Sequence, residues 1–138
     1  MFALLLLFAA SPVAYLPATD ITITDGDTVS ASLVLTPDIQ LIRQSIRSVN
    51  YDSWESFRSR RSKPFTDFTD TQWKAEQVKG AKAKDELAAL VSTGDLYIVL
   101  RGRDVYGRLL AEFWVYREAT DELIDVAEVM KAKGHLRK

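Results

Sequence analysis

The chain has 138 residues, of which 47% are hydrophobic and 27% charged, so it is long enough to bury the core of one domain without covalent cross-links. It contains no cysteine, which excludes disulfides, thiolate metal sites and a cysteine nucleophile. The formal net charge of -1 provides no overall sign of nucleic-acid binding, but the charges are unevenly distributed. Residues 1–57 carry two basic and six acidic side chains, whereas residues 58–138 carry sixteen basic and thirteen acidic ones. An acidic first part suits a bound cation, and a basic second part suits a polyanion.

Residues 2–10 form an apolar run of Phe, Leu and Ala. Its length is typical of the hydrophobic region of a signal peptide and is short for a bilayer span. Residues 1–18 are therefore expected to be a signal peptide, and the protein is expected to be secreted or periplasmic. The run lacks the Lys or Arg that usually precedes such a region, so an uncleaved membrane anchor or a misassigned start is the alternative.

Two β segments follow, at residues 21–24 and 29–36, where the side chains alternate or are often β-branched. Asp25-Gly26-Asp27 between them has turn chemistry, so the two segments predict a β-hairpin. Residues 39–51 predict a third strand. Its apolar side chains do not keep one strict alternation, which predicts a bulge or bend near residues 43–45.

Residues 56–69 are rich in polar and basic side chains and have no apolar period. They predict an exposed loop that could steer a nucleic-acid strand. Asp70 or Thr71 is expected to cap a helix over residues 72–91. The buried face of that helix is predicted from an i, i+4, i+7, i+8 spacing and comprises Ala83, Leu87, Leu90 and Val91.

Residues 96–100 and 109–116 predict two further strands. Residues 121–132 predict a last amphipathic helix, with its buried side chains at Leu123, Val126, Ala127 and Met130. Three strands, a helix, two strands and a helix is the element order of an OB-type barrel. We therefore expect a mainly β (α+β) fold, a five-stranded OB-fold barrel with a helix after the third strand and a C-terminal helix, formed by residues 19–138 as one domain.

Three short segments carry the charged side chains that suggest chemistry. They are Asp25-Gly26-Asp27-Thr28-Val29, the stretch from Arg47 to Glu55, and Asp104-Val105-Tyr106-Gly107-Arg108. In these segments the chain resembles the staphylococcal nuclease (thermonuclease) family, whose signatures are D-G-D-T-V, R-x-x-x-x-D-T-P-E and D-x-Y-G-R. The first and third signatures match fully, and the second matches at Arg47, Asp52 and Glu55. The resemblance implies the OB fold of that family from about residue 18 to residue 132.

The resemblance also implies a calcium site. Asp27 and Asp52 match the carboxylate ligands of the family, and Ser53 stands where a threonine provides its main-chain carbonyl. Calcium prefers hard oxygen ligands and tolerates irregular geometry, so this donor set suits Ca²⁺. Asp25 lies two residues from Asp27 and is expected in the outer shell.

Phosphodiester hydrolysis needs an attacking water, a group that deprotonates or orients it, and positive charge near the phosphorus. By resemblance, Glu55 is the base that activates the water. Arg47 and Arg108 are the expected phosphate clamps, because a guanidinium stays charged and offers two parallel hydrogen bonds. Tyr106 matches the aromatic residue that neighbours the nucleotide.

Two residues depart from the family pattern. Trp54 replaces the proline before the glutamate, and Val105 replaces a lysine that contacts phosphate. Trp54 either offers a stacking face to a base or fills space beside the barrel. His135 is the only histidine and no G-x-S-x-G segment exists, which argues against a Ser-His-Asp hydrolase.

The sequence thus predicts an exported, monomeric, calcium-dependent endonuclease that hydrolyses DNA and RNA with low sequence specificity and needs no stable protein partner. By resemblance, cleavage would leave 3'-phosphate ends. The alternative from another class is a noncatalytic OB-fold module that binds single strands by a basic groove and by stacking. A degenerate family member without activity is the third reading.

Overall fold

The computed structural model describes residues 4–6, 13–54 and 69–137. In these residues the strands are β1 (Leu4–Leu6), β2 (Val13–Asp25), β3 (Thr28–Thr36), β4 (Ile39–Ser48), β5 (Asp95–Arg103), β6 (Leu109–Arg117) and β7 (Glu122–Asp125). The helices are α1 (Asp70–Val91) and α2 (Val126–Ala132), and a 3₁₀ turn spans Glu118–Thr120. The predicted basic loop over residues 56–69 lies outside the described residues, except for Thr69.

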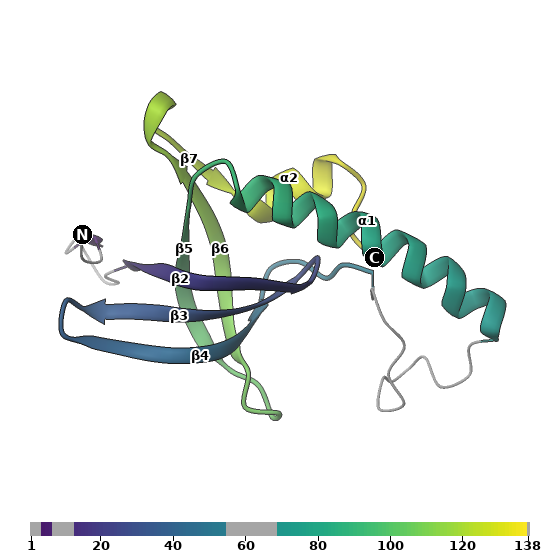
Figure 1. The fold of residues 1–138 in the computed structure, drawn as a ribbon, viewed down its shortest axis with the longest axis horizontal. Helices are drawn as coiled ribbons and strands as arrows, with labels where there is room; N and C mark the ends of the chain where they lie inside the picture. Colours follow the sequence, from purple (N-terminus) through teal and green to yellow (C-terminus); the bar gives the residue numbers. More distant parts are fainter. Residues whose placement is uncertain (1–3, 7–12, 55–68, 138) are drawn as a thin grey trace.

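Five strands close into a barrel in the order β2, β3, β4, β6, β5 and back to β2. The pairing of β4 with β6 is parallel, with Ile46 opposite Leu109, and the other pairings in the barrel are antiparallel. Figure 1 shows β2, β3 and β4 crossing β5 and β6 at a steep angle, with α1 inserted after the third barrel strand. This arrangement confirms the expected OB-type α+β fold, to which β7 adds a further strand beside β6.

Strand β2 begins at Val13, earlier than the predicted start at residue 21. It bends at Asp20, which has a positive φ of 51° and coincides with a shift in the register with β3. Before the bend, Leu16 pairs with Ile98 of β5 and closes the barrel. Cleavage of a leader near residue 10 would leave this closure intact, whereas cleavage near residue 18 would remove it.

The predicted irregularity in β4 is present as a bulge. Leu41 and Gln44 pair with Leu33 and Ala31 of β3, so two residues of β4 lie opposite Ser32 alone. Arg43 at the bulge has a φ of 50°, and its N–H donates to the Ser32 hydroxyl at 3.1 Å. The bulge bends β4 as barrel closure requires, and it keeps this backbone donor satisfied.

The barrel core consists of side chains from alternate positions of the strands. In β6 the inward residues are Leu109, Ala111, Phe113 and Val115. The buried face of α1 includes Ala83, Leu87 and Leu90 as predicted, whereas Val91 is only partly buried. The predicted N-cap was wrong by one or two residues, because Thr69 and Gln72 form a reciprocal capping box that defines an earlier helix start.

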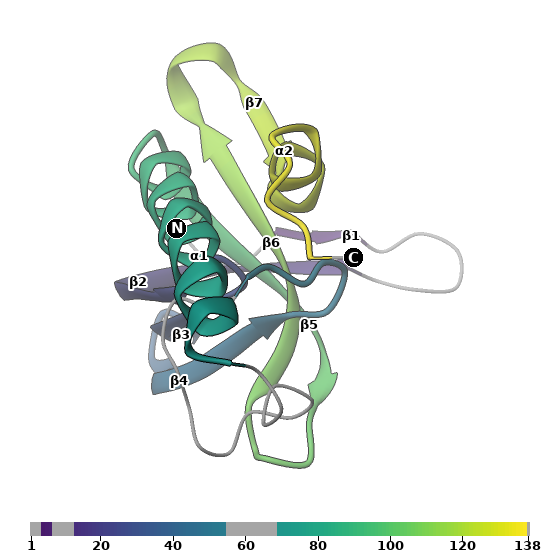
Figure 2. The same ribbon diagram turned by 90° about the vertical axis from the view of Figure 1, so that its right-hand side faces the viewer.

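The predicted helix over residues 121–132 was wrong in its first part. Residues 122–125 form β7 instead, and Leu123 is 45% exposed opposite Tyr116 of β6. The helix begins only where the Asp125 carboxylate caps it by accepting from the Ala127 N–H at 3.0 Å. Val126 and Met130 are buried as expected, whereas Ala127 is only partly buried. Figure 2 shows α2 and β7 at the opposite end of the molecule from the β5–β6 turn.

Candidate active site

Asp27 lies on the turn between β2 and β3 and is only 4% exposed. Its Oδ1 accepts from the Thr28 hydroxyl at 2.9 Å, and its Oδ2 accepts from the Ser53 N–H at 3.1 Å. Gly26 allows this close approach, because a Cβ there would lie 2.6 Å from Ser53 Oγ and 2.7 Å from Ala83 Cβ. The D-G-D segment is thus a packed turn that orients one carboxylate.

Tyr51 fastens that turn to the chain after β4. Its hydroxyl donates to the Gly26 carbonyl at 2.6 Å, and its ring packs edge-on against Phe113. The Ser48 N–H adds a bond to the Asp27 carbonyl at 2.8 Å. Tyr51 precedes Asp52 in the chain and Gly26 precedes Asp27, so this one hydrogen bond helps to set the relative position of the two aspartates.

Arg47, near the end of β4, contacts both aspartates. Its Nη2 lies 2.8 Å from Asp52 Oδ1 and 3.5 Å from Asp27 Oδ2. Burial raises the pKa of Asp52, and the hydrogen bond and negative charge of Asp27 raise it further, while the positive charges of Arg47 and Arg137 act in the opposite direction. Two carboxylates therefore face each other closely enough for an added cation to be favourable.

Arg108 and Tyr106 lie on the β5–β6 turn, which Asp104 organises. Asp104 Oδ1 accepts from the backbone N–H groups of Tyr106 and Arg108, both at 2.9 Å, and Oδ2 accepts from Arg108 Nε at 2.7 Å. Gly107 supplies the positive φ of 84° that the turn needs. Burial works against ionisation of Asp104, but the bonds from Arg108 and Tyr106 outweigh it and hold its pKa below the ordinary value.

These segments meet at an open pocket of about 550 Å³. Its lining residues are Arg47, Ser48, Val49, Asn50, Tyr51, Asp52, Asp104, Tyr106, Arg108 and Leu110. Tyr106 is 82% exposed, and the Arg108 guanidinium lies 5.7 Å from its ring centre. The structure thus places four of the predicted site residues around one pocket, and Asp27 contacts one of them, Arg47.

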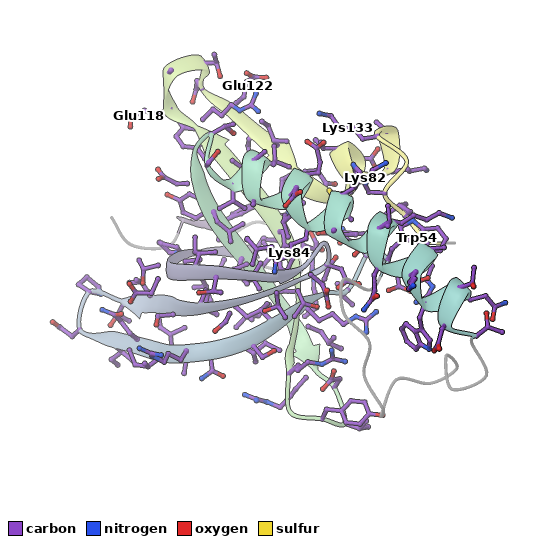
Figure 3. All side chains as sticks on the ribbon, turned by 45° about the vertical axis from the view of Figure 1, so that its right-hand side comes forward. Trp54, Lys82, Lys84, Glu118, Glu122 and Lys133 are labelled. Carbon is purple, nitrogen blue, oxygen red and sulfur yellow. The ribbon has the colours of Figure 1, made fainter. Side chains whose placement is uncertain are left out.

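The remaining predicted residues have different outcomes. Ser53 is buried and donates its N–H to Asp27, while its expected role as a carbonyl ligand stays a prediction. Glu55 lies outside the described residues. Trp54 lies beside α1, as Figure 3 shows, where Lys79 Nζ is 4.2 Å and the Arg137 guanidinium 5.9 Å from its ring centre. The Trp54 ring therefore lies against α1 and the segment after α2, and whether it also stacks on a base stays a prediction.

The donor set at Asp27 and Asp52 fits a hard cation such as Ca²⁺, which binds carboxylates, main-chain carbonyls and waters. It consists of two acidic side chains, and no group of three or more His, Cys, Asp or Glu that could hold a metal occurs among the described residues. The site would therefore need main-chain or water oxygens to complete the coordination.

Sequence reasoning missed the parts played by Asp104 and Tyr51. Asp104 carried a local signal, since an aspartate two residues before a turn position commonly bonds the backbone ahead of it. Tyr51 carried none, because its partner Gly26 is 25 residues away in the sequence.

Comparison with known proteins adds no identification. No family model matches the sequence, and no curated protein is significantly similar to it. Neither helix in the described part of the chain is long and apolar enough to span a membrane.

Proposed function

We propose that this chain is a calcium-dependent endonuclease that hydrolyses phosphodiester bonds in DNA and RNA with low sequence specificity. The proposal rests on one arrangement, in which Arg47, Asp52, Tyr106 and Arg108 line the same open pocket with Asp27 behind them. An adjacent carboxylate pair and two guanidinium groups match what phosphodiester hydrolysis needs, a cation site and positive charge for the phosphate.

In this proposal Asp27 and Asp52 hold the calcium ion. Asp27 is already oriented by Thr28 and Ser53, so it would lose little conformational freedom on binding. When bound, calcium would polarise the phosphate and bring an attacking water to it. Arg47 contacts both carboxylates in the described arrangement, and the ion would take over part of that charge neutralisation.

Asp104 orients the Arg108 side chain for phosphate binding. The bond to Asp104 uses Nε, and among the described residues no hydrogen bond engages the two Nη groups of Arg108. Those groups form the fork that would bind two phosphate oxygens. Arg47 would contribute a second guanidinium from β4, and Glu55 would activate the water.

A noncatalytic single-strand-binding module is the second candidate. The observation that favours it is the exposure of Tyr106 and its neighbour Val105 at the tip of the β5–β6 turn. An exposed aromatic ring beside an arginine can stack on a base without any cleavage.

A cleavage assay separates these functions. Purified protein is incubated with supercoiled plasmid and with a single-stranded oligonucleotide, in calcium and in a calcium chelator. We expect cleavage only in the samples that contain calcium. Binding of the oligonucleotide without cleavage would instead support the noncatalytic module, and cleavage that persists in chelator would contradict the calcium site.

Two arginine variants give a matched comparison. Arg108→Met should lower the cleavage rate by about 10² to 10³, the usual effect of losing one group that stabilises developing charge. Arg101→Met is the control. Arg101 of β5 forms an ion pair with Glu112 of β6 and does not line the pocket. Equal loss in both variants would refute a specific role for Arg108.

A further inference from the structure

The segment that follows α2 returns to the candidate site. Gly134 has a positive φ of 74°, and the N–H of His135 donates to the Met130 carbonyl at 2.9 Å. The chain then runs antiparallel to the stretch after β4, where Leu136 pairs with Ser53. The Arg137 N–H donates to the main-chain carbonyl of Asp52 at 2.8 Å. Residues 136–137 therefore pair with the two residues that carry a proposed carboxylate and a proposed carbonyl ligand.

The Arg137 side chain joins this pairing to α1. Its Nη2 lies 3.4 Å from Oε2 of Glu76, which is only 4% exposed. Its guanidinium also lies 5.9 Å from the centre of the Trp54 ring, with Lys79 of α1 at 4.2 Å from the same ring. A carboxylate as buried as that of Glu76 is costly unless it is paired. The contact with Arg137 is thus a strong restraint between the helix and the returning segment.

We infer that Arg137 is a positioning residue for the calcium site, which holds Asp52 and Ser53 in place from the side opposite Asp27. On one side, Ser53 donates to the Asp27 carboxylate and Tyr51 donates to the turn. On the other side, Arg137 binds the Asp52 carbonyl with its backbone and α1 with its side chain. With both sides held, the separation of the two carboxylates is set before any cation binds. This inference rests on the proposed calcium-dependent function.

Two single variants test the inference by calorimetric calcium titration of the full chain. Arg137→Met keeps an unbranched side chain and removes the charge. We expect it to weaken calcium binding by about 10-fold to 100-fold, the usual cost of losing a group that orients a metal ligand. Lys133→Met is the control, because Lys133 pairs with Glu86 at 3.1 Å and has no ion pair or hydrogen bond with the described residues 49–54. Equal calcium affinities in the two variants would overturn the inference.

A double variant separates positioning from simple destabilisation. Arg137→Met alone removes an ion-pair partner of buried Glu76 and should lower the melting temperature. The double variant Glu76→Met/Arg137→Met also removes the buried negative charge. Its melting temperature should therefore recover most of that loss. Calcium binding should stay weak in it. Recovery of calcium affinity together with the melting temperature would show that Arg137 acts only on stability.

Hydrogen exchange provides a readout that does not depend on calcium. The Ser53 N–H bonded to Asp27 should exchange at least about 10-fold faster in Arg137→Met than in Lys133→Met, since its segment is held from one side only. Unchanged Ser53 exchange would overturn the inference even if the wild type proved active. If instead the wild type binds no calcium, the proposed function fails, and the exchange rates still decide whether Arg137 positions this segment.

Discussion

Replacing Tyr51 by phenylalanine tests the hydrogen bond that connects the Asp27 turn to the stretch carrying Asp52. The variant keeps the ring that packs against Phe113 and removes the hydroxyl that donates to the Gly26 carbonyl at 2.6 Å. Tyr51 is 6% exposed, so water cannot readily replace the lost donor.

The size of the effect follows from this burial. A buried carbonyl that loses its partner costs about 1 to 3 kcal/mol. A chain of 138 residues unfolds with an entropy of about 0.3 kcal/mol/K at its midpoint, so each kcal/mol corresponds to about 3 to 4 °C. We therefore expect Tyr51→Phe to melt about 3 to 10 °C below the wild type at neutral pH.

Thermal unfolding without calcium measures this difference, and Tyr116→Phe is the control. The Tyr116 hydroxyl donates to the Asp121 carboxylate at 2.7 Å, but this bond is exposed and water can replace it. Its loss should lower the melting temperature by less than about 2 °C. If Tyr51→Phe melts within 1 °C of Tyr116→Phe, on the order of experimental error, the hydroxyl does not hold the turn.

The pH dependence gives a second test of the same contact. Burial raises the pKa of Tyr51 well above its ordinary value, and the negative charges of Asp27 and Asp125 raise it further. The folded protein therefore holds the Tyr51 proton more tightly than the unfolded chain does. That contribution to stability is complete below about pH 10 and is lost as the pH rises toward the folded-state pKa. The difference in melting temperature between wild type and Tyr51→Phe should narrow above about pH 10, and a constant difference would contradict the assigned environment.

The other predictions concern the calcium site and the chemistry. Asp27→Ala and Asp52→Ala should each weaken calcium binding in a calorimetric titration, and unchanged affinity in both would exclude this ligand pair. Because the pKa of Asp52 is raised, calcium affinity should increase with pH until that carboxyl is ionised, and Asp52→Asn should flatten the profile. Arg47→Lys, Arg108→Lys and Glu55→Gln should each lower single-turnover rates in saturating calcium by about 10² to 10⁴. A Glu55→Gln rate within about threefold of wild type would mean that another group activates the water.

The sequence alone determined most of the secondary structure and the fold class. Alternating apolar residues predicted the barrel strands, and the irregular spacing near Arg43 predicted the bulge that the structure contains. These signals are local, because side-chain periodicity and turn chemistry depend on neighbours in the chain. They failed at residues 121–125, where pairing with β6 made a strand of a segment whose apolar spacing also fits a helix. The apolar spacing of a short segment carries no information about the strand with which that segment pairs.

For the candidate site too, local sequence signals predicted some features and not others. The three motifs predicted its residues, and the hydrogen bonds of Asp104 could have been predicted from the turn in which it lies. Tertiary structure alone decided which residues touch. Pairing of β3 with β4 brings Asp27 to Arg47 and Asp52, and pairing of β4 with β6 brings Arg108 to the same pocket. The bonds from Tyr51 to Gly26 and from Arg137 to Asp52 join residues 25 and 85 positions apart. Such contacts arise from packing of the whole chain, so no local pattern in the sequence encodes them.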